Sequence, residues 1–126
     1  MNIRVSAQGG SRVAIIESEE LLIRSVQDAL DLMATVSYQH ECHKMVVPKE
    51  AIAPEFFDLK TRLAGEILQK YTNYQMKLAI VGAFDTSRSK SLHDFIYESN
   101  KGSQVFFLPD EETAVSRLHQ LSQAGI

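Results

Sequence analysis

The sequence predicts an α/β domain with a mostly parallel sheet, because short apolar runs alternate with longer segments of helical periodicity. The apolar runs are 13–16, 45–47, 78–81 and 105–108. Between them, apolar residues recur every three to four positions, which is the spacing of one face of a helix. Strands that alternate with helices in this way are typical of parallel sheets joined by crossover helices.

Composition narrows the class of protein further. The chain has 126 residues, a formal net charge of −3 and one cysteine, Cys42. A domain of this length buries about two-thirds of its unfolded surface and needs no disulfide, and a lone thiol suits a reducing compartment. We therefore expect one cytoplasmic domain spanning residues 1–126. No apolar run approaches the roughly 20 residues of a membrane span, and the negative charge disfavours nonspecific nucleic-acid binding.

The N-terminal part predicts a β-hairpin followed by a helix. Residues 2–7 alternate between apolar and polar, and Gly9 and Gly10 can form a tight turn into a second strand at 12–16. Ser18 is the expected N-cap of the first helix, and the acidic residues that follow it suit the positive end of the helix dipole. The apolar face of this helix consists of Leu22, Val26, Ala29, Met33 and Val36.

The middle of the chain predicts a third strand and the longest helix. The strand covers 43–47 and is closed by Pro48, and after a short connection the helix is expected to begin at Glu55. Gly65 within this helix predicts a close approach by the sheet, since glycine otherwise weakens a helix. Opposite charges four residues apart predict two exposed ion pairs. They are Asp58 with Arg62 and Glu66 with Lys70.

A fourth strand is expected at 77–81, followed by a polar loop that reaches Lys90. Ser91 and Asp94 have the spacing of a capping box, which predicts the start of a third helix. That helix is expected to end near Gly102, in the left-handed conformation that glycine favours.

A fifth strand at 104–108 and a final helix with an acidic first turn complete the chain. The order is therefore β, β, α, β, α, β, α, β, α. It predicts a mixed, mostly parallel five-stranded sheet with about four helices on its faces and the first strand antiparallel at an edge.

This order of elements resembles the STAS fold of anti-sigma factor antagonists and of the cytoplasmic tails of sulfate transporters. In STAS domains an aspartate-serine pair at the start of the second helix carries the serine that a partner kinase phosphorylates. Asp58 corresponds to the aspartate, but Leu59 occupies the position of the serine, and Thr61 is a nearby hydroxyl. The segments that carry the resemblance are Met45-Val46-Val47, Phe56-Phe57-Asp58-Leu59, Lys77 to Gly82, and Val105 to Glu112 with Ala114.

A second resemblance covers nearly the whole chain. It is sharpest in the runs 56–61, 63–70, 89–92 and 94–102. These runs are similar to an uncharacterised bacterial family, domain of unknown function 4180. The resemblance supports the fold and implies no activity.

Two polar regions are candidate functional surfaces. The loop after the fourth strand lies where open α/β sheets bind ligands, and with the amides of the next helix it could hold a phosphate or carboxylate. Its candidate residues are Thr86, Ser87, Ser89 and Lys90. The start of the second helix gathers acidic, basic and hydroxyl groups, namely Asp58, Lys60, Thr61 and Glu66. The ordinary alternatives are a capped, solvated loop and a set of surface ion pairs.

Other polar patterns receive structural interpretations. His40-Glu41-Cys42-His43 contains metal-ligating residue types, but an extended chain sends alternate side chains to opposite sides, so we expect no metal. His93 and His119 lie on predicted helices and are interpreted as surface residues. The tyrosines are expected at the edge of the core more than at an interface. They are Tyr38, Tyr71, Tyr74 and Tyr97.

No stretch combines a nucleophile, a base and an orienting group, and no cofactor motif is present. We therefore predict a noncatalytic regulatory or protein-interaction module of STAS type that contacts another protein through Asp58, Lys60 and Thr61. The alternative is a binding protein or a minor enzyme that holds a small molecule or an anion such as a phosphate or nucleotide through Thr86, Ser87, Ser89 and Lys90. A homodimer that buries the tyrosine-bearing helices is a third interpretation.

Overall fold

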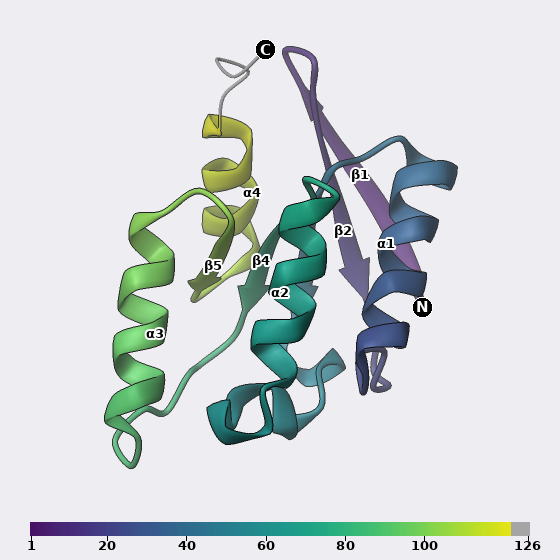
Figure 1. The fold of residues 1–126 in the computed structure, drawn as a ribbon. Helices are drawn as coiled ribbons and strands as arrows, with labels where there is room; N and C mark the ends of the chain where they lie inside the picture. The colour runs from purple at the N-terminus through teal and green to yellow at the C-terminus, as the bar shows by residue number, and fades with distance from the viewer. Residues whose placement is uncertain (122–126) are drawn as a thin grey trace.

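The computed structural model of the protein describes residues 1–121. Its centre is a five-stranded sheet in the order β1-β2-β3-β4-β5 (Figure 1). β1 is antiparallel to β2, and all other neighbours are parallel. The α/β class, the mixed sheet and the edge position of the first strand are thus confirmed. The strands are β1 (Asn2–Gln8), β2 (Ser11–Glu17), β3 (Lys44–Pro48), β4 (Lys77–Val81) and β5 (Val105–Leu108).

Helices cover both faces of the sheet (Figure 1). The three crossover helices share a face because each right-handed crossover leads to the next strand in the same direction. The fourth follows the last strand and packs on the opposite face. The helices are α1 (Val26–His40), α2 (Leu63–Asn73), α3 (Lys90–Lys101) and α4 (Glu111–Gln120). Short 3₁₀ turns connect β3 to α2: η1 (Lys49–Ala51), η2 (Pro54–Phe57) and η3 (Leu59–Thr61).

The N-terminal hairpin forms as predicted. Gln8 pairs with Ser11 across Gly9 and Gly10. The φ angles of these glycines are 54° and 86°, the left-handed conformation that a two-residue hairpin turn requires.

α1 begins later than predicted, because Ser25 rather than Ser18 is its N-cap. The Ser25 hydroxyl accepts a hydrogen bond from the backbone N–H of Asp28 at 3.1 Å, whereas Ser18 closes a local turn. Between them, Ile23 forms a parallel bridge with Ile52 and is buried. This tertiary pairing overrides the local preference for a helix.

α2 also begins later than predicted, at Leu63. Arg62 precedes it with a φ of 66°, a left-handed conformation that is not continued within a helix. Asp58 lies ahead of this break, and its predicted pairing with Arg62 is absent from the ion pairs of the described residues. The predicted pair of Glu66 with Lys70 is absent from them as well.

Three further local predictions are wrong. Gly65 is exposed, and no atom beyond its chain neighbours and its own helix backbone lies within 4 Å of the position that its Cβ would take, so the sheet does not approach it. α3 is capped by Ser89, which accepts from the N–H of Leu92 at 3.1 Å, and not by Ser91. Gly102 has a φ of −91° and therefore does not adopt the left-handed conformation.

The larger core lies between the sheet and α1, α2 and α3. At its centre, the fully buried Tyr71 donates its hydroxyl to the carbonyl oxygen of Ala29 at 2.7 Å, which joins α2 to α1. Burial raises the pKa of the Tyr71 hydroxyl, so it stays protonated and remains a donor. The predicted position at the core edge is wrong for all four tyrosines, because Tyr71 is fully buried and the others are exposed. Tyr38, Tyr74 and Tyr97 are 86%, 62% and 56% exposed.

The smaller core lies on the opposite face, where α4 packs across the sheet. Ala114 and Leu118 are fully buried there. None of the described helices is both long enough and apolar enough to span a membrane.

We predict that Tyr71→Phe lowers the free energy of unfolding by about 1 kcal/mol, because it removes one buried hydrogen bond without opening a cavity. Urea denaturation measures the loss. Tyr74→Phe is the matched control, since Tyr74 is 62% exposed, and it should leave stability unchanged. Equal losses in the two variants would contradict a special role for the hydrogen bond to Ala29.

Candidate functional site

An apolar pocket lies beyond the carboxyl ends of the central parallel strands. We call it the strand-end pocket, and its volume is about 590 Å³. Open α/β sheets bind ligands outside the carboxyl ends of their strands, and the volume falls within the range of known ligand sites. Both features make this pocket the candidate site. It is lined by Leu21, Lys49, Glu50, Ile52, Pro54, Phe57, Phe84, Asp85 and Leu92.

Two aromatic rings form one wall of the pocket. Phe57 comes from η2 and Phe84 from the loop after β4, and their ring centroids are 5.9 Å apart. Phe57 also packs against the buried Phe56 at 5.1 Å, and Phe84 meets the buried Phe107 edge to face at 5.4 Å. The wall is therefore anchored in the larger core, and it joins the two regions that the sequence marks as candidate surfaces.

Lys49 lies against this wall. Its Nζ is 6.0 Å from the centroid of the Phe57 ring and 5.6 Å from that of Phe84, and it donates to the carbonyl oxygen of Ala83 at 2.6 Å. Gly82 permits the approach, because a Cβ at this position would lie only 2.8 Å from the Cβ of Lys49. The ammonium group is thus held in place by an acceptor and by aromatic faces.

The rim of the pocket also carries two carboxylates and one exposed apolar side chain. Hydrogen bonds from Ser87, together with the charge of Lys49, lower the pKa of Asp85, so this carboxylate is ionised at neutral pH. Glu50 adds a second acidic group, and Leu21 is 44% exposed at the pocket. The site is therefore apolar inside, with a rim of mixed charge.

The predicted anion-binding loop lies beside the pocket, but its polar groups contact one another. The Ser89 hydroxyl caps α3, and Lys90 forms an ion pair with Asp94 at 2.7 Å. The Thr86 hydroxyl lies 3.3 Å from Nδ1 of His93. An anion bound here would have to displace some of these contacts.

The predicted polar residues around the start of α2 are spread over the preceding turns and the helix. The Asp58 carboxylate accepts from the N–H of Lys60 at 3.2 Å. The Thr61 hydroxyl lies 2.7 Å from the carbonyl oxygen of Glu55 and 2.8 Å from that of Asp58, so it stabilises the turn. Glu66 lines a separate groove along α2.

None of the predicted polar residues lines the strand-end pocket, although their neighbours Phe57 and Asp85 do. The candidate residues predicted from the sequence and the strand-end pocket lie at the same edge of the sheet, but the aromatic groups of the pocket were not predicted. A signal was available, because Phe84 is a large apolar residue within an otherwise polar loop.

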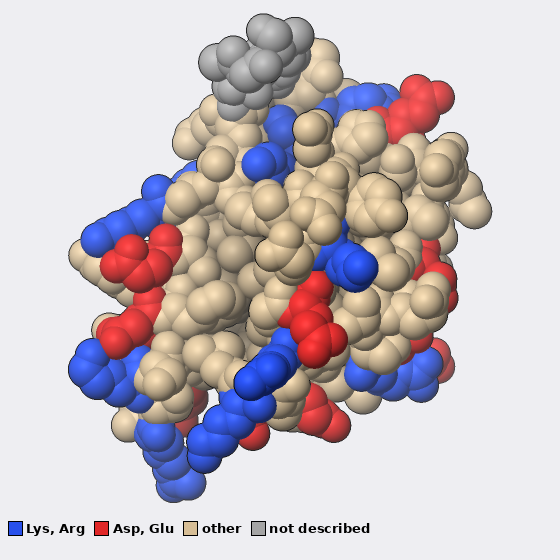
Figure 2. Space-filling view, in the orientation of Figure 1, with Lys and Arg blue, Asp and Glu red and all other residues tan. Residues whose placement is uncertain are grey.

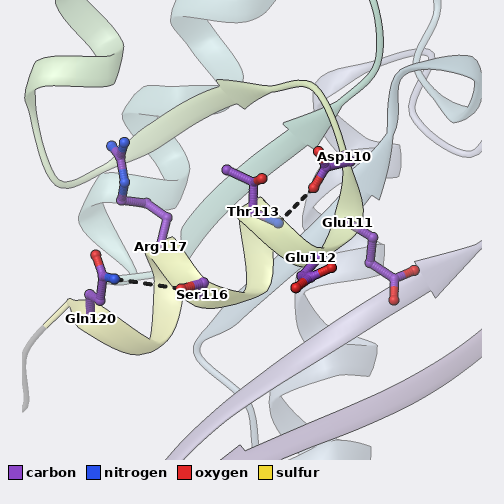
Figure 3. Close-up of a pocket in the computed structure, with 7 residues that line it drawn as sticks. All are labelled: Asp110, Glu111, Glu112, Thr113, Ser116, Arg117 and Gln120. Carbon is purple, nitrogen blue, oxygen red and sulfur yellow. Dashed lines mark hydrogen bonds between the residues drawn. The ribbon is translucent and has the colours of Figure 1, made fainter.

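A second depression, of about 970 Å³, runs along the exposed side of α4 (Figure 3). All residues that line it belong to α4 or to its N-cap. Asp110 uses its carboxylate to accept from the N–H of Thr113 at 2.7 Å. This surface is therefore a solvated helix face, and we do not consider it a site.

Charged side chains of both signs are mixed over the face formed by α1, α2 and α3 (Figure 2). Proteins that bind nucleic acid usually present a basic patch or stripe. This face has no such patch. Among residues 1–121, no group of three or more His, Cys, Asp or Glu side chains is placed to hold a metal ion.

The sequence matches the family described as Domain of unknown function (DUF4180) over residues 8–118. The chain belongs to this family. Comparisons with curated proteins and with solved structures found no match. The predicted membership of domain of unknown function 4180 is confirmed.

The DUF4180 chain also contains a polar network between the hairpin and α4. Nδ1 of His119 lies 2.8 Å from the Ser11 hydroxyl, and Nε2 lies 2.9 Å from the Ser6 hydroxyl. Lys44 donates to Ser11 at 2.9 Å, and Ser11 is the one buried polar residue among those described. The interpretation of His119 as an ordinary surface residue is therefore wrong.

This network joins the hairpin to α4 and β3 through polar groups. Lys44 can only donate, so Ser11 accepts from it. The two ring nitrogens of His119 each lie within hydrogen-bond distance of one serine hydroxyl, so the neutral imidazole can donate to one serine and accept from the other. Burial, with a smaller effect from Lys44, lowers the pKa of His119 and keeps it neutral.

We predict that the His119 network weakens as the pH falls. The pKa of His119 is lowered from 6.5 in the folded protein, so the unfolded chain takes up the proton first and stability is lost below about pH 6.5. Wild type should exceed His119→Asn by about 1 to 2 kcal/mol at pH 8, and by less at pH 5.5. Urea denaturation across this range measures the difference. An NMR titration midpoint of the His119 ring at or above 6.5 would contradict the argument.

Proposed function

We propose that this DUF4180 protein is a noncatalytic binding module that takes an apolar side chain of a partner protein into the strand-end pocket. The observation that carries the proposal is the aromatic wall of Phe57 and Phe84, anchored on the buried Phe107. An apolar concave surface beside an exposed large apolar residue, here Leu21, is typical of an interaction site.

The polar groups of the pocket favour binding over chemistry. Lys49 donates to a backbone carbonyl, and Asp85 accepts from the N–H of Ser87 at 2.9 Å. The residues that line the pocket include no serine, cysteine or histidine. The pocket therefore offers an apolar surface and charges, but no serine or cysteine nucleophile with an adjacent histidine base.

The rim indicates the chemistry of the partner. Lys49 is held by the Ala83 carbonyl, whereas the carboxylates of Glu50 and Asp85 lie at the rim. Complementary charge at a polar rim sets specificity and the rate of association. We therefore propose a partner segment with an aromatic or aliphatic anchor flanked by a lysine or arginine.

A regulatory role of STAS type is the finer form of this proposal. Two observations support it: the alternation of strands and crossover helices, and the position of Asp58 directly after the pocket residue Phe57. Because Leu59 stands where the STAS serine would be, regulation would depend on occupancy of the pocket rather than on a phosphoserine. We further propose a cytoplasmic location, since the free thiol of Cys42 suits a reducing compartment.

We predict that peptides selected against the wild-type protein from a random display library carry an apolar anchor next to a basic residue. Leu21→Lys should weaken their binding by about tenfold, which corresponds to about 1.4 kcal/mol of lost apolar contact. Fluorescence polarisation with a labelled selected peptide measures the affinity. Tyr74→Lys is the matched control, because it adds the same charge at another exposed apolar residue, and it should bind as wild type does.

Two outcomes would contradict the proposal: selected peptides without an apolar anchor, or unchanged affinity in Leu21→Lys. The anion alternative has its own test with inorganic phosphate. A phosphate-dependent rise in Tm that disappears in Lys90→Ala would favour it over the strand-end pocket.

A further inference from the structure

The two edge strands of the sheet, β5 and β1, differ in whether their outward-facing backbone groups form hydrogen bonds. At the β5 edge, the Asn100 side chain accepts from the N–H of Phe107 at 2.8 Å and donates to its carbonyl oxygen at 3.2 Å. The amide thus occupies both outward-facing groups of Phe107, as a neighbouring strand would. Proteins protect edge strands in such ways because unpaired backbone groups recruit other strands. The outward-facing backbone groups of Phe107, at the centre of this edge, are therefore not available to a further strand.

The β1 edge has no comparable protection. Gln8 and Ser11 flank a two-residue turn as a hydrogen-bonded pair, so the alternate residues Ile3, Val5 and Ala7 direct their peptide groups away from β2. Among the described residues, no side chain or loop forms a hydrogen bond with these groups. The β1 register with β2 is also continuous, so no bulge turns the edge away.

Charged side chains on an edge strand usually hinder its pairing with another strand, and β1 has little protection of this kind. Arg4 is the only charged residue of β1. It is tied to the neighbouring strand and to α4, through Glu17 at 3.0 Å and Glu111 at 2.7 Å. Its charge is therefore balanced and directed across the sheet face rather than along the edge.

We infer that β1 is a self-association surface, through which two copies of this chain pair in antiparallel fashion about a two-fold axis at Val5. The pairing would extend the five-stranded sheet across the axis. It would use the outward peptide groups of Ile3, Val5 and Ala7 in about six backbone hydrogen bonds.

The β1 sequence is complementary to itself in this register. Val5 lies opposite the partner's Val5, and Ile3 lies opposite the partner's Ala7. On the other face, Arg4 lies opposite the partner's Ser6, so no like charges meet. Polar Asn2 and Gln8 face each other at the two ends. The register therefore avoids the like-charge pairs that destabilise neighbouring strands.

Apolar burial adds to the backbone hydrogen bonds. Ile3 packs against the larger core, but Val5, two residues on and therefore on the same face, is 36% exposed. Ala7 is exposed too. In the dimer, Val5 covers the partner's Val5, and Ala7 lies beside the partner's Ile3. Interfaces that bury less than roughly 1,200 Å² are typically weak, so dimerisation through one strand should depend on concentration.

Sedimentation velocity over a concentration series tests the association. The wild-type protein should shift from monomer to dimer, and Val5→Lys should remain monomeric because two ammonium groups would meet at the axis. Leu21→Lys is the matched control, since it adds the same charge at a similarly exposed apolar residue outside β1. It should dimerise as wild type does. Circular dichroism verifies that each variant is folded.

Cysteine crosslinking tests the register. In the proposed pairing, the two Val5 Cα atoms are about 5.5 Å apart, within the roughly 4.4 to 6.8 Å that a disulfide spans. The two Ala7 Cα atoms are about 14 Å apart. Under mild oxidation, Val5→Cys should therefore form a covalent dimer much faster than Ala7→Cys. The native Cys42 is buried and does not interfere.

Three results would overturn the inference. The first is a wild-type protein that stays monomeric at several hundred micromolar. The second is a dimer that persists in Val5→Lys, which would place the interface elsewhere. The third is equal crosslinking of Val5→Cys and Ala7→Cys, which would exclude the register centred on Val5.

Discussion

A parallel sheet must be covered on both faces, and the way this chain meets that requirement determines the rest of the structure. Its right-handed crossovers all advance in one direction, so α1, α2 and α3 lie on the same face. The opposite face is left to α4, which follows the last strand. One helix cannot cover five strands, and the His119 network and the contact of Arg4 with Glu111 therefore join the hairpin to α4 through polar groups.

The strands could be predicted from the sequence because their signal is local and apolar. The strand at 77–81 has the predicted bounds, and a run buried on both faces is apolar throughout. The starts of the helices were predicted less accurately than the strands, because tertiary contacts decide where a helix begins. Ile23 pairs with Ile52 rather than entering α1, and the left-handed Arg62 delays α2 until the turns after β3 are complete.

The candidate site was predictable in position but not in chemistry. Topology places the carboxyl ends of the parallel strands at one edge, which the sequence already indicated. The polar residues expected there are used locally, since Ser89 caps α3 and Thr61 closes a turn. What lines the pocket depends on the contact of Phe57 with Phe84. This contact joins segments distant in the sequence, and no periodic pattern reveals it.

The pocket and the open β1 edge are independent surfaces, which gives their combination a physical consequence. The residues of the pocket follow β2, β3 and β4, and none belongs to β1. In the proposed dimer, pairing through β1 would therefore leave both pockets outside the β1 interface. Two linked sites raise the effective concentration of the second binding event, so a partner with two anchor segments would bind such a dimer more tightly than a partner with one. The proposed pairing would in this way favour partners that are themselves dimeric or carry repeated anchors.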